Sequence, residues 1–194
     1  MQGRMTVGRY RAIDLTLFAV IEIVFETILV RAGREWFPRE GWTVSCAAAV
    51  TAAVMIRWGP WCGIHAGIGG IATVMASQGT GRAFAIYGIG NLAALAIWPA
   101  ARKIGGRRLR ESTLCNLLFS ASILLSMQGG RILTGMATGM PIEEGILFIT
   151  GDSISYIFTG AIVWIMGRGD GMLEDQGEYL QRIHEEQKGE GGAA

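Results

Sequence analysis

The stretch AVIEIVFETILV, residues 19–30, decides the fold class of this chain. Nearly all of its residues are apolar, as in a helix that crosses a membrane, yet it contains Glu22 and Glu26. Carboxylates are costly in hydrocarbon, and those found in membrane spans face protein or water. The two glutamates are four residues apart and therefore share one helix face. The stretch predicts a membrane-spanning helix whose polar face points into a bundle.

Long uncharged stretches extend this prediction over the rest of the chain. Of the 194 residues, 51% are hydrophobic and only 17% are charged, and the charges are clustered between apolar runs. An apolar run of about 17–25 residues is long enough to cross the hydrocarbon as a helix. We therefore predict an all-α membrane protein in which residues 1–168 form a six-helix transmembrane substrate-binding domain. The predicted spans are 12–30, 42–57, 59–78, 83–101, 113–131 and 146–167.

The distribution of lysine and arginine predicts the orientation of these spans. An even number of spans places both termini on one side, and cytoplasmic loops carry the excess of basic residues. With the termini inside, twelve of the 17 basic residues are cytoplasmic and five are external. The run ARKIGGRRLR, residues 101–110, is the strongest single signal, and we interpret it as an orientation anchor. We therefore expect a multi-pass protein of a bacterial inner or plasma membrane, surrounded by membrane lipid, with both termini in the cytoplasm.

Polar residues within the spans gather in the half nearer the outside, which predicts a pocket open to the exterior. Ionisable residues inside membrane spans are functional candidates by default. A polar and an aromatic residue one helical turn apart suit a small planar ligand. The candidate ligand-binding residues are Glu26, Tyr87, Asn91, Gln128, Arg131, Asp152 and Tyr156.

These residues also have structural interpretations. Glu22 and Glu26 either contact a ligand or a cation, or they form hydrogen bonds within the bundle, with a proton on the carboxyl group as a further alternative. Asp152 and Arg131 form either an ion pair or a ligand anchor, and Asn91 serves equally well in interhelical hydrogen bonding. Because the charges in this region have both signs, the charge of the ligand is left open.

Several classes of function are not indicated by the sequence. Cys62 and His65 supply only two potential metal ligands, and no second pair has matching spacing, so we predict no metal site. The sequence contains no nucleophile elbow, HExxH motif or P-loop. We therefore expect a protein that is not an enzyme, binds no cofactor and hydrolyses no nucleotide itself. The net charge of +1 gives no indication of a nucleic-acid partner.

The composition changes after Arg168, and residues 169–194 form a polar, acidic tail. Apolar residues at helical spacing predict a cytoplasmic amphipathic helix over 172–187, with the Gly- and Ala-rich end disordered. An acidic helix is a poor match for an anionic membrane surface. It suits a protein partner better, and contact with the basic run 101–110 is the alternative.

The whole pattern resembles the substrate-binding S component of energy-coupling factor (ECF) transporters. The resemblance rests on GPWCGIHAGIGGIA (59–72), on YGIGNLA (87–93), on the basic connection between the fourth and fifth spans, and on residues 151–183. It implies a subunit that binds a vitamin or similar micronutrient on the outer side. It also implies docking on an ECF transmembrane coupling protein driven by two cytoplasmic ATPases. The alternative is a stand-alone proton-coupled secondary transporter that uses the intramembrane glutamates.

Overall fold

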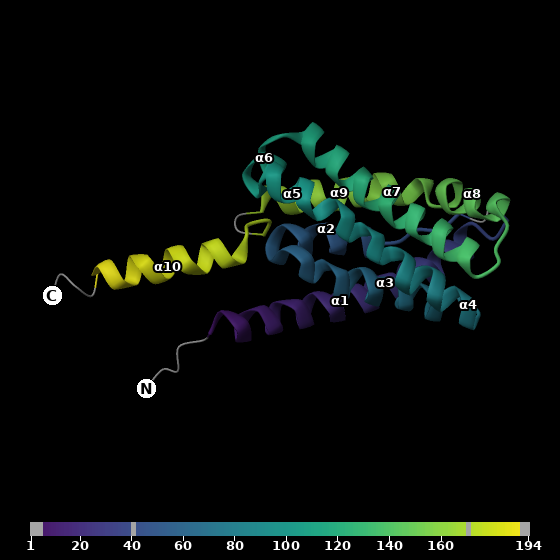
Figure 1. Cartoon of the computed structure of the whole chain (residues 1–194), viewed down its shortest axis with the longest axis horizontal. Helices are drawn as coiled ribbons and strands as arrows, with labels where there is room; N and C mark the ends of the chain where they lie inside the picture. The colour runs from purple at the N-terminus through teal and green to yellow at the C-terminus, as the bar shows by residue number, and fades with distance from the viewer. Residues whose placement is uncertain (1–5, 40–41, 170–171, 191–194) are drawn as a thin grey trace.

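A computed structural model describes residues 6–39, 42–169 and 172–190 (Figure 1). All regular structure in these residues is helical, which confirms the predicted all-α class. The α-helices are α1 (Val7–Trp36), α2 (Ala47–Trp58), α3 (Cys62–Ala76), α4 (Gly81–Phe84), α5 (Trp98–Ile104), α6 (Gly106–Glu111), α7 (Thr113–Ala137), α8 (Ile142–Gly151), α9 (Ser153–Arg168) and α10 (Gln176–Glu190). Three further helical segments are η1 (Gly59–Trp61), η2 (Ala85–Ile89) and η3 (Asn91–Ile97).

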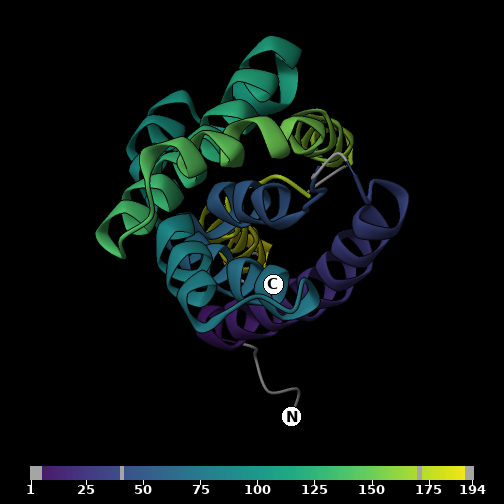
Figure 2. The same ribbon diagram turned by 90° about the vertical axis from the view of Figure 1, so that its right-hand side faces the viewer.

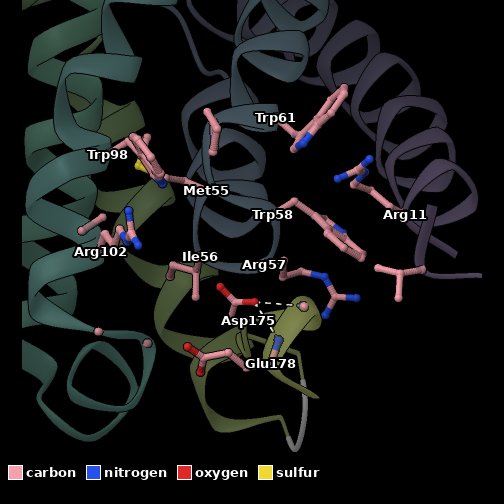
Figure 3. Close-up of a pocket in the computed structure, with 17 residues that line it drawn as sticks. Arg11, Met55, Ile56, Arg57, Trp58, Trp61, Trp98, Arg102, Asp175 and Glu178 are labelled. Carbon is pink, nitrogen blue, oxygen red and sulfur yellow. Dashed lines mark hydrogen bonds between the residues drawn. The ribbon is translucent and has the colours of Figure 1, made fainter. Parts of the chain in front are cut away.

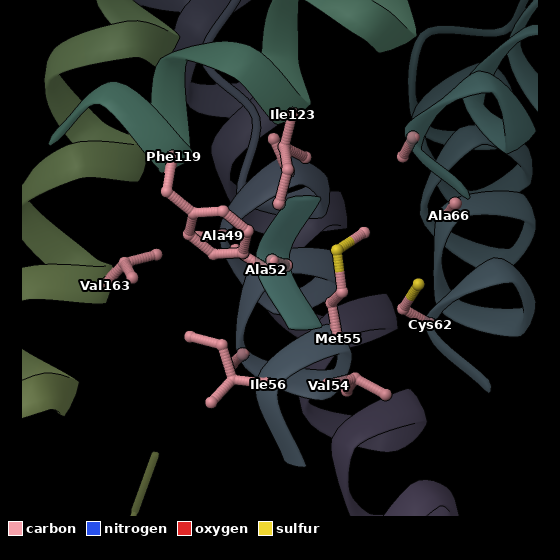
Figure 4. Packing of buried hydrophobic residues seen from close by; sticks show 14 of the residues in the cluster. Ala49, Ala52, Val54, Met55, Ile56, Cys62, Ala66, Phe119, Ile123 and Val163 are labelled. Carbon is pink, nitrogen blue, oxygen red and sulfur yellow. The ribbon is translucent and has the colours of Figure 1, made fainter. Parts of the chain in front are cut away.

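Helix α2 lies in the middle of the bundle and contacts α1, α3, α7 and α9 (Figure 2). Its sequence is rich in alanine, which has the highest helix propensity and lets neighbouring backbones approach closely. Every residue of α2 except Val50 is buried. The hydrophobic cluster around it joins Ala49, Ala52 and Met55 to Phe119, Ile123 and Val163 of α7 and α9 (Figure 4). The run of small residues in the second predicted span therefore forms the centre of the core.

Helix α1 is polar on its buried face and apolar on its exposed face. Glu22 and Glu26 are both 0% exposed, whereas Leu17, Val24 and Ile28 are 57%, 50% and 56% exposed. A helix on a water-soluble bundle shows the reverse arrangement, with its apolar stripe against the core. The outer face of α1 is thus suited to lipid, and the two glutamates point into the bundle as predicted.

The described residues contain two helices that are long and apolar enough to cross a membrane: the continuous run Gly81–Ile104, which includes α4, η2, η3 and α5, and helix α7. Helices α8 and α9 also qualify when they are taken together as one bent span. Helices α2 and α3 have only 12 and 15 residues. The fold is compatible with a membrane protein, while the count of six spans and the cytoplasmic termini stay predictions.

Two of the predicted spans are irregular. The fourth contains the π-helical turn Ala85–Ile89, followed by a 3-10 segment. The sixth is not one continuous helix, because α8 and α9 meet at Asp152 with a bend of 44°. Glycine and aspartate are weak helix formers, and Gly151 and Asp152 stand together at this break. The sixth predicted span, 146–167, therefore consists of two helices, and its crossing of the membrane as one bent span stays a prediction.

The beginning of the tail packs against the bundle. Leu173 is 0% exposed, and Arg110 forms an ion pair of 3.0 Å with Glu174. Helix α10 begins at Gln176 rather than at Met172, because the Asp175 carboxylate accepts hydrogen bonds from the first backbone N–H groups of the helix. Contact with the basic run 101–110 was one of the two alternatives for the tail, and the structure shows it at Glu174, just before α10; a protein partner for the tail stays a prediction. The predicted disordered end lies outside the described residues.

Candidate functional site

Arg131 is the centre of a buried polar cluster near the end of the bundle that carries α4 and α8. Its side chain is only 3% exposed. The guanidinium group donates from Nη1 to Asp152 at 2.6 Å and from Nε to Asn91 Oδ1 at 2.7 Å. The ring of Tyr87 covers it, with 4.6 Å between the guanidinium carbon and the ring centroid. Three of the predicted site residues therefore contact a fourth, Arg131, and the ion pair that was one of the two alternatives for Asp152 and Arg131 is present.

The partners of Arg131 lie in the two irregular regions, the fourth predicted span and the break between α8 and α9. Tyr87 lies in the π-helical turn of the fourth predicted span, and Asn91 begins the 3-10 segment that follows it. Asp152 stands at the break between α8 and α9. π-Helical turns and broken membrane helices are both frequent at functional sites. The cluster thus combines the two places where the backbone departs from a regular helix.

Glycines let the fourth span approach α7 at this point. A Cβ atom on Gly90 would lie 2.7 Å from the backbone nitrogen of Arg131, which is closer than a side chain tolerates. Gly130 of α7 faces Gly90 in the same crossing. Close backbone contact through small residues is a common way to pack membrane helices. The crossing holds Arg131 within reach of Asn91, which in turn donates from Nδ2 to the carbonyl oxygen of Ala66 in α3 at 3.1 Å.

Gln128 and Tyr156 form a second pair one helical turn further into the bundle on α7 and α9. The Tyr156 hydroxyl donates to Gln128 Oε1 at 2.5 Å. The Gln128 Nε2 group is buried and has no hydrogen-bond partner in the described part of the chain. Because Gln128 and Tyr156 are three and four residues from Arg131 and Asp152, they continue the same polar strip along both helices.

A short segment before α2 connects Asp152 with Glu26. The Thr43 hydroxyl donates to Asp152 Oδ1, and Ser155 Oγ donates to the Thr43 carbonyl oxygen at 3.3 Å. Ser155 Oγ also accepts from the backbone N–H of Ser45 at 3.1 Å. The Ser45 hydroxyl then donates to Glu26 Oε2 at 3.0 Å. The predicted site residues are therefore linked from α9 to α1 by one hydrogen-bonded path.

Glu26 has hydrogen-bond partners on both carboxyl oxygens. Oε2 accepts from the Ser45 hydroxyl, from the Cys46 backbone N–H at 2.8 Å and from the Cys46 thiol at 3.3 Å. Oε1 lies 2.6 Å from Thr73 Oγ1, which also lies 2.8 Å from the carbonyl oxygen of Gly69. A hydroxyl group has only one proton to donate. Thr73 therefore either shares its proton between the two oxygens or donates it to Gly69 and accepts a proton from Glu26 Oε1.

Glu22 forms a different environment one turn away. Its Oε2 lies 2.8 Å from Nδ1 of His65 on α3, and both side chains are fully buried. Glu22 Oε1 and His65 Nε2 are buried without a hydrogen-bond partner among the described residues. The His65 ring packs edge-on against Phe18. Each partner of this pair thus has one polar atom with a hydrogen-bond partner and one without, whereas both carboxyl oxygens of Glu26 have partners.

Sequence reasoning missed several members of this network. His65 was considered only as a metal ligand, and Thr43, Ser45, Thr73 and Ser155 were not considered as a group. The signal available for the last two was the placement of hydroxyl residues inside apolar spans, where they hydrogen-bond across helices. No sequence signal pairs His65 with Glu22, which are 43 positions apart, because the segment between them carries no pattern that fixes the packing of α1 on α3.

The cluster combines groups of different chemical character. In the described residues, no group of three or more His, Cys, Asp or Glu side chains has the arrangement of a metal site. The cluster contains a cation, a carboxylate, an amide and an aromatic ring, which are groups able to contact a small polar molecule with a planar part. Arg131, Asp152 and Asn91 are hydrogen-bonded to one another, so any further group would have to replace one of these contacts.

Comparisons with protein-family models, with curated proteins and with solved structures return no match for this chain.

Proposed function

We propose that this chain is the substrate-specificity subunit of an ATP-driven importer of the ECF type, which binds a vitamin or similar micronutrient in the membrane. The observation that carries the proposal is the convergence of the π-helical turn at Tyr87 and the helix break at Asp152 on one buried arginine. Broken membrane helices supply binding groups in many transporters. A fold that only fills the membrane has no need of such a cluster, because buried ionisable groups are expensive there.

The entrance to this site is the pair of rings formed by Tyr87 and Phe148 of α8. Their planes are perpendicular, with centroids 5.7 Å apart, and both side chains are partly exposed. A planar ligand that inserts between them meets the Arg131 guanidinium beneath the Tyr87 ring. Binding then exchanges the contacts of Arg131 with Asp152 and Asn91 for contacts with the ligand.

The proposal includes the partners and the location that the sequence resemblance implies. The chain lies in a bacterial inner or plasma membrane with both termini in the cytoplasm, and it acts as a binding subunit rather than as an enzyme. A transmembrane coupling protein and two ATPases supply the energy. Gentle purification from the native membrane is expected to retain these three proteins with the chain.

Thermal unfolding of the purified chain with small-molecule fractions from its own host tests the binding function. A ligand that binds only the folded protein stabilises it by about 2.7 kcal/mol when the free ligand concentration is one hundred times the dissociation constant. We expect at least one fraction to raise the melting temperature of the wild type but not of Tyr87→Leu.

Trp164→Leu is the matched control for that experiment. Trp164 also lies beneath an arginine, with 4.3 Å between its ring and the guanidinium carbon of Arg168, but it belongs to the other end of α9. The control is expected to respond like the wild type. A shift that persists in Tyr87→Leu would contradict the site, and the absence of any shift with all fractions would contradict the binding function.

A second function, proton-coupled secondary transport, is favoured by one observation. The Glu22–His65 pair is fully buried and has one unsatisfied polar atom on each partner, which is the arrangement of a group that takes up and releases protons. Under this proposal, proteoliposomes that contain the chain alone take up the substrate when the proton gradient is imposed. Uptake that requires the ATPases and ignores the gradient would reject it, and Glu22→Gln identifies the carboxylate involved.

A further inference from the structure

A cavity of about 460 Å³ opens at the other end of the bundle, where the basic residues of the chain concentrate. Three parts of the fold line it: the start of α1, the corner between α2 and α3, and α5 with the turn that follows it. The first residues of α10 form its remaining side. Figure 3 shows Arg11, Trp58 and Trp61 on one side, Trp98 and Arg102 opposite them, and Asp175 and Glu178 below. The volume is within the range of small-molecule sites, about 300–1,000 Å³.

Two arginines on opposite walls of this cavity are not neutralised by a carboxylate. Arg11 lies against the ring of Trp61 at 4.4 Å and Arg102 against that of Trp98 at 5.8 Å. Neither forms an ion pair within the part of the chain that the structure describes. Arg57, which also lines the cavity, binds both carboxylate oxygens of Asp14 and is already engaged. Guanidinium groups with free donors are the preferred ligands of phosphate oxygens.

Acidic groups occupy the side of the cavity that the tail forms. Asp175 and Glu178 are exposed, and Asp175 caps α10 through the backbone N–H groups of Gly177 and Glu178. The Asp175 carboxylate is therefore held beside the cavity at the start of α10, and Glu178 lines the cavity from the first turn of that helix. The lining thus presents two cationic groups on its walls and two anionic groups at one side.

The aromatic residues give the cavity the composition of a membrane interface. Trp58, Trp61 and Trp98 surround it, and tryptophan is enriched at the level of lipid headgroups. Gly59 is required at the corner, since its φ is +60° and a Cβ atom there would lie 2.9 Å from the indole nitrogen of Trp98. Basic pockets between membrane helices on the cytoplasmic side bind lipid headgroups.

We propose that this cavity binds a zwitterionic phosphate ester that carries an ammonium group, with the phosphate on Arg11 and Arg102 and the ammonium group on Asp175 and Glu178. The two carboxylates would repel a purely anionic ligand, and the two arginines would repel a purely cationic one. The headgroup of phosphatidylethanolamine and soluble phosphoethanolamine share the required chemistry. This site lies at the opposite end of the bundle from the proposed solute site and does not depend on it.

The test titrates the purified full chain with dihexanoyl phosphatidylethanolamine, dihexanoyl phosphatidylglycerol and soluble phosphoethanolamine, and measures dissociation constants by native mass spectrometry. The wild type is expected to bind the ethanolamine lipid more tightly than the glycerol lipid. Arg102→Gln is expected to weaken both lipids about tenfold, the loss of one charged hydrogen bond. Lys103→Gln removes the neighbouring charge outside the cavity and is expected to change binding less than about twofold.

Glu178→Gln separates this proposal from simple attraction of anions. It is expected to weaken the ethanolamine lipid about tenfold and to leave the glycerol lipid unchanged or tighter, which also shows that the variant is folded. Tight binding of soluble phosphoethanolamine identifies a soluble ligand, and binding of the lipid alone identifies a headgroup site; both support the proposal. Equal weakening by Lys103→Gln, preference for the glycerol lipid, or no effect of Glu178→Gln would overturn it.

Discussion

Arg131 and the pair Arg11 and Arg102 occupy opposite ends of the bundle and show two ways of placing an arginine in this fold. Arg131 is buried, and Asp152, Asn91 and Tyr87 use its donors and its flat face. Arg11 and Arg102 stand at an open cavity, with their flat faces on indole rings and no carboxylate in ion-pair contact within the described residues.

The two regions differ in the free-energy penalty for a guanidinium group without a partner. A guanidinium group far from water must have its partners inside the protein, because an unpaired buried charge is strongly destabilising. At the open end water satisfies the donors, and a ligand replaces water without breaking a protein contact. Under the two proposals, binding at the buried region requires Arg131 to leave its partners, whereas binding at the open region breaks no protein contact.

The largest expected effect is on stability at the closed end. Asp152→Ala leaves Arg131 buried without its carboxylate, and we expect a loss of about 3–5 kcal/mol in the free energy of unfolding. Unfolding in mixed micelles with increasing denaturing detergent measures it. The double variant Arg131→Met with Asp152→Ala removes both charges and is expected to recover part of the loss. Equal stability of wild type and Asp152→Ala would remove the distinction between the two ends.

Glu26 extends the closed region to α1, and two substitutions there give different results. Glu26→Met leaves the Ser45 hydroxyl and the Cys46 N–H without an acceptor, and we expect a loss of about 2–3 kcal/mol in the free energy of unfolding. Glu26→Gln keeps that acceptor and donates to Thr73, which passes its own proton to the Gly69 carbonyl oxygen. Its expected cost is below about 1 kcal/mol. A large cost of Glu26→Gln in the same unfolding assay would show that Glu26 carries no proton.

Two glycines near the crossing that holds Arg131 have opposite surroundings, which makes them a matched pair for substitution. Gly90→Ala places a methyl group 2.7 Å from the Arg131 backbone, and we expect overpacking to cost about 1–3 kcal/mol of stability. Gly129→Ala meets nothing within 4 Å, and we expect it to be neutral or to stabilise α7 by up to about 1 kcal/mol. Melting temperatures of the two variants test this order, and the reverse order would contradict the crossing.

The smallest expected effect is at the open end. Arg102→Gln removes an exposed side chain without a described ion pair, and we expect a change within about 0.5 kcal/mol in the free energy of unfolding. The same unfolding assay, carried out without added lipid, measures it. A loss comparable to that of Asp152→Ala would mean that Arg102 is structural, and the two arginine regions would then not differ in kind.

The sequence predicted the all-α class and the buried face of α1, because charges among apolar residues at helical spacing leave one orientation for the helix. It also paired Asp152 with Arg131, since both fall near the ends of adjacent predicted spans. It did not predict the break at Asp152 or the π-helical turn at Tyr87. The π-helical turn adjoins the close crossing of Gly90 with Gly130 of α7, and a tertiary contact of this kind leaves no periodic pattern. The weak helix formers Gly151 and Asp152 stood at the break in the sequence, but they were not interpreted as one.

The open cavity was equally invisible in the sequence. Arg11, Trp61 and Arg102 come from three segments, and the basic run 101–110 was interpreted only as an orientation anchor. The contact of Arg110 with Glu174 places the start of the tail against the bundle, while a protein partner for α10 stays a prediction.

Native mass spectrometry of the chain, purified gently from its own host, tests the central claim that the Arg131 cluster binds a small solute. The account predicts a co-purifying small molecule of defined mass in the wild type and in Trp164→Leu, and its loss in Tyr87→Leu. An empty protein in all three preparations, or a molecule retained by Tyr87→Leu, would contradict it.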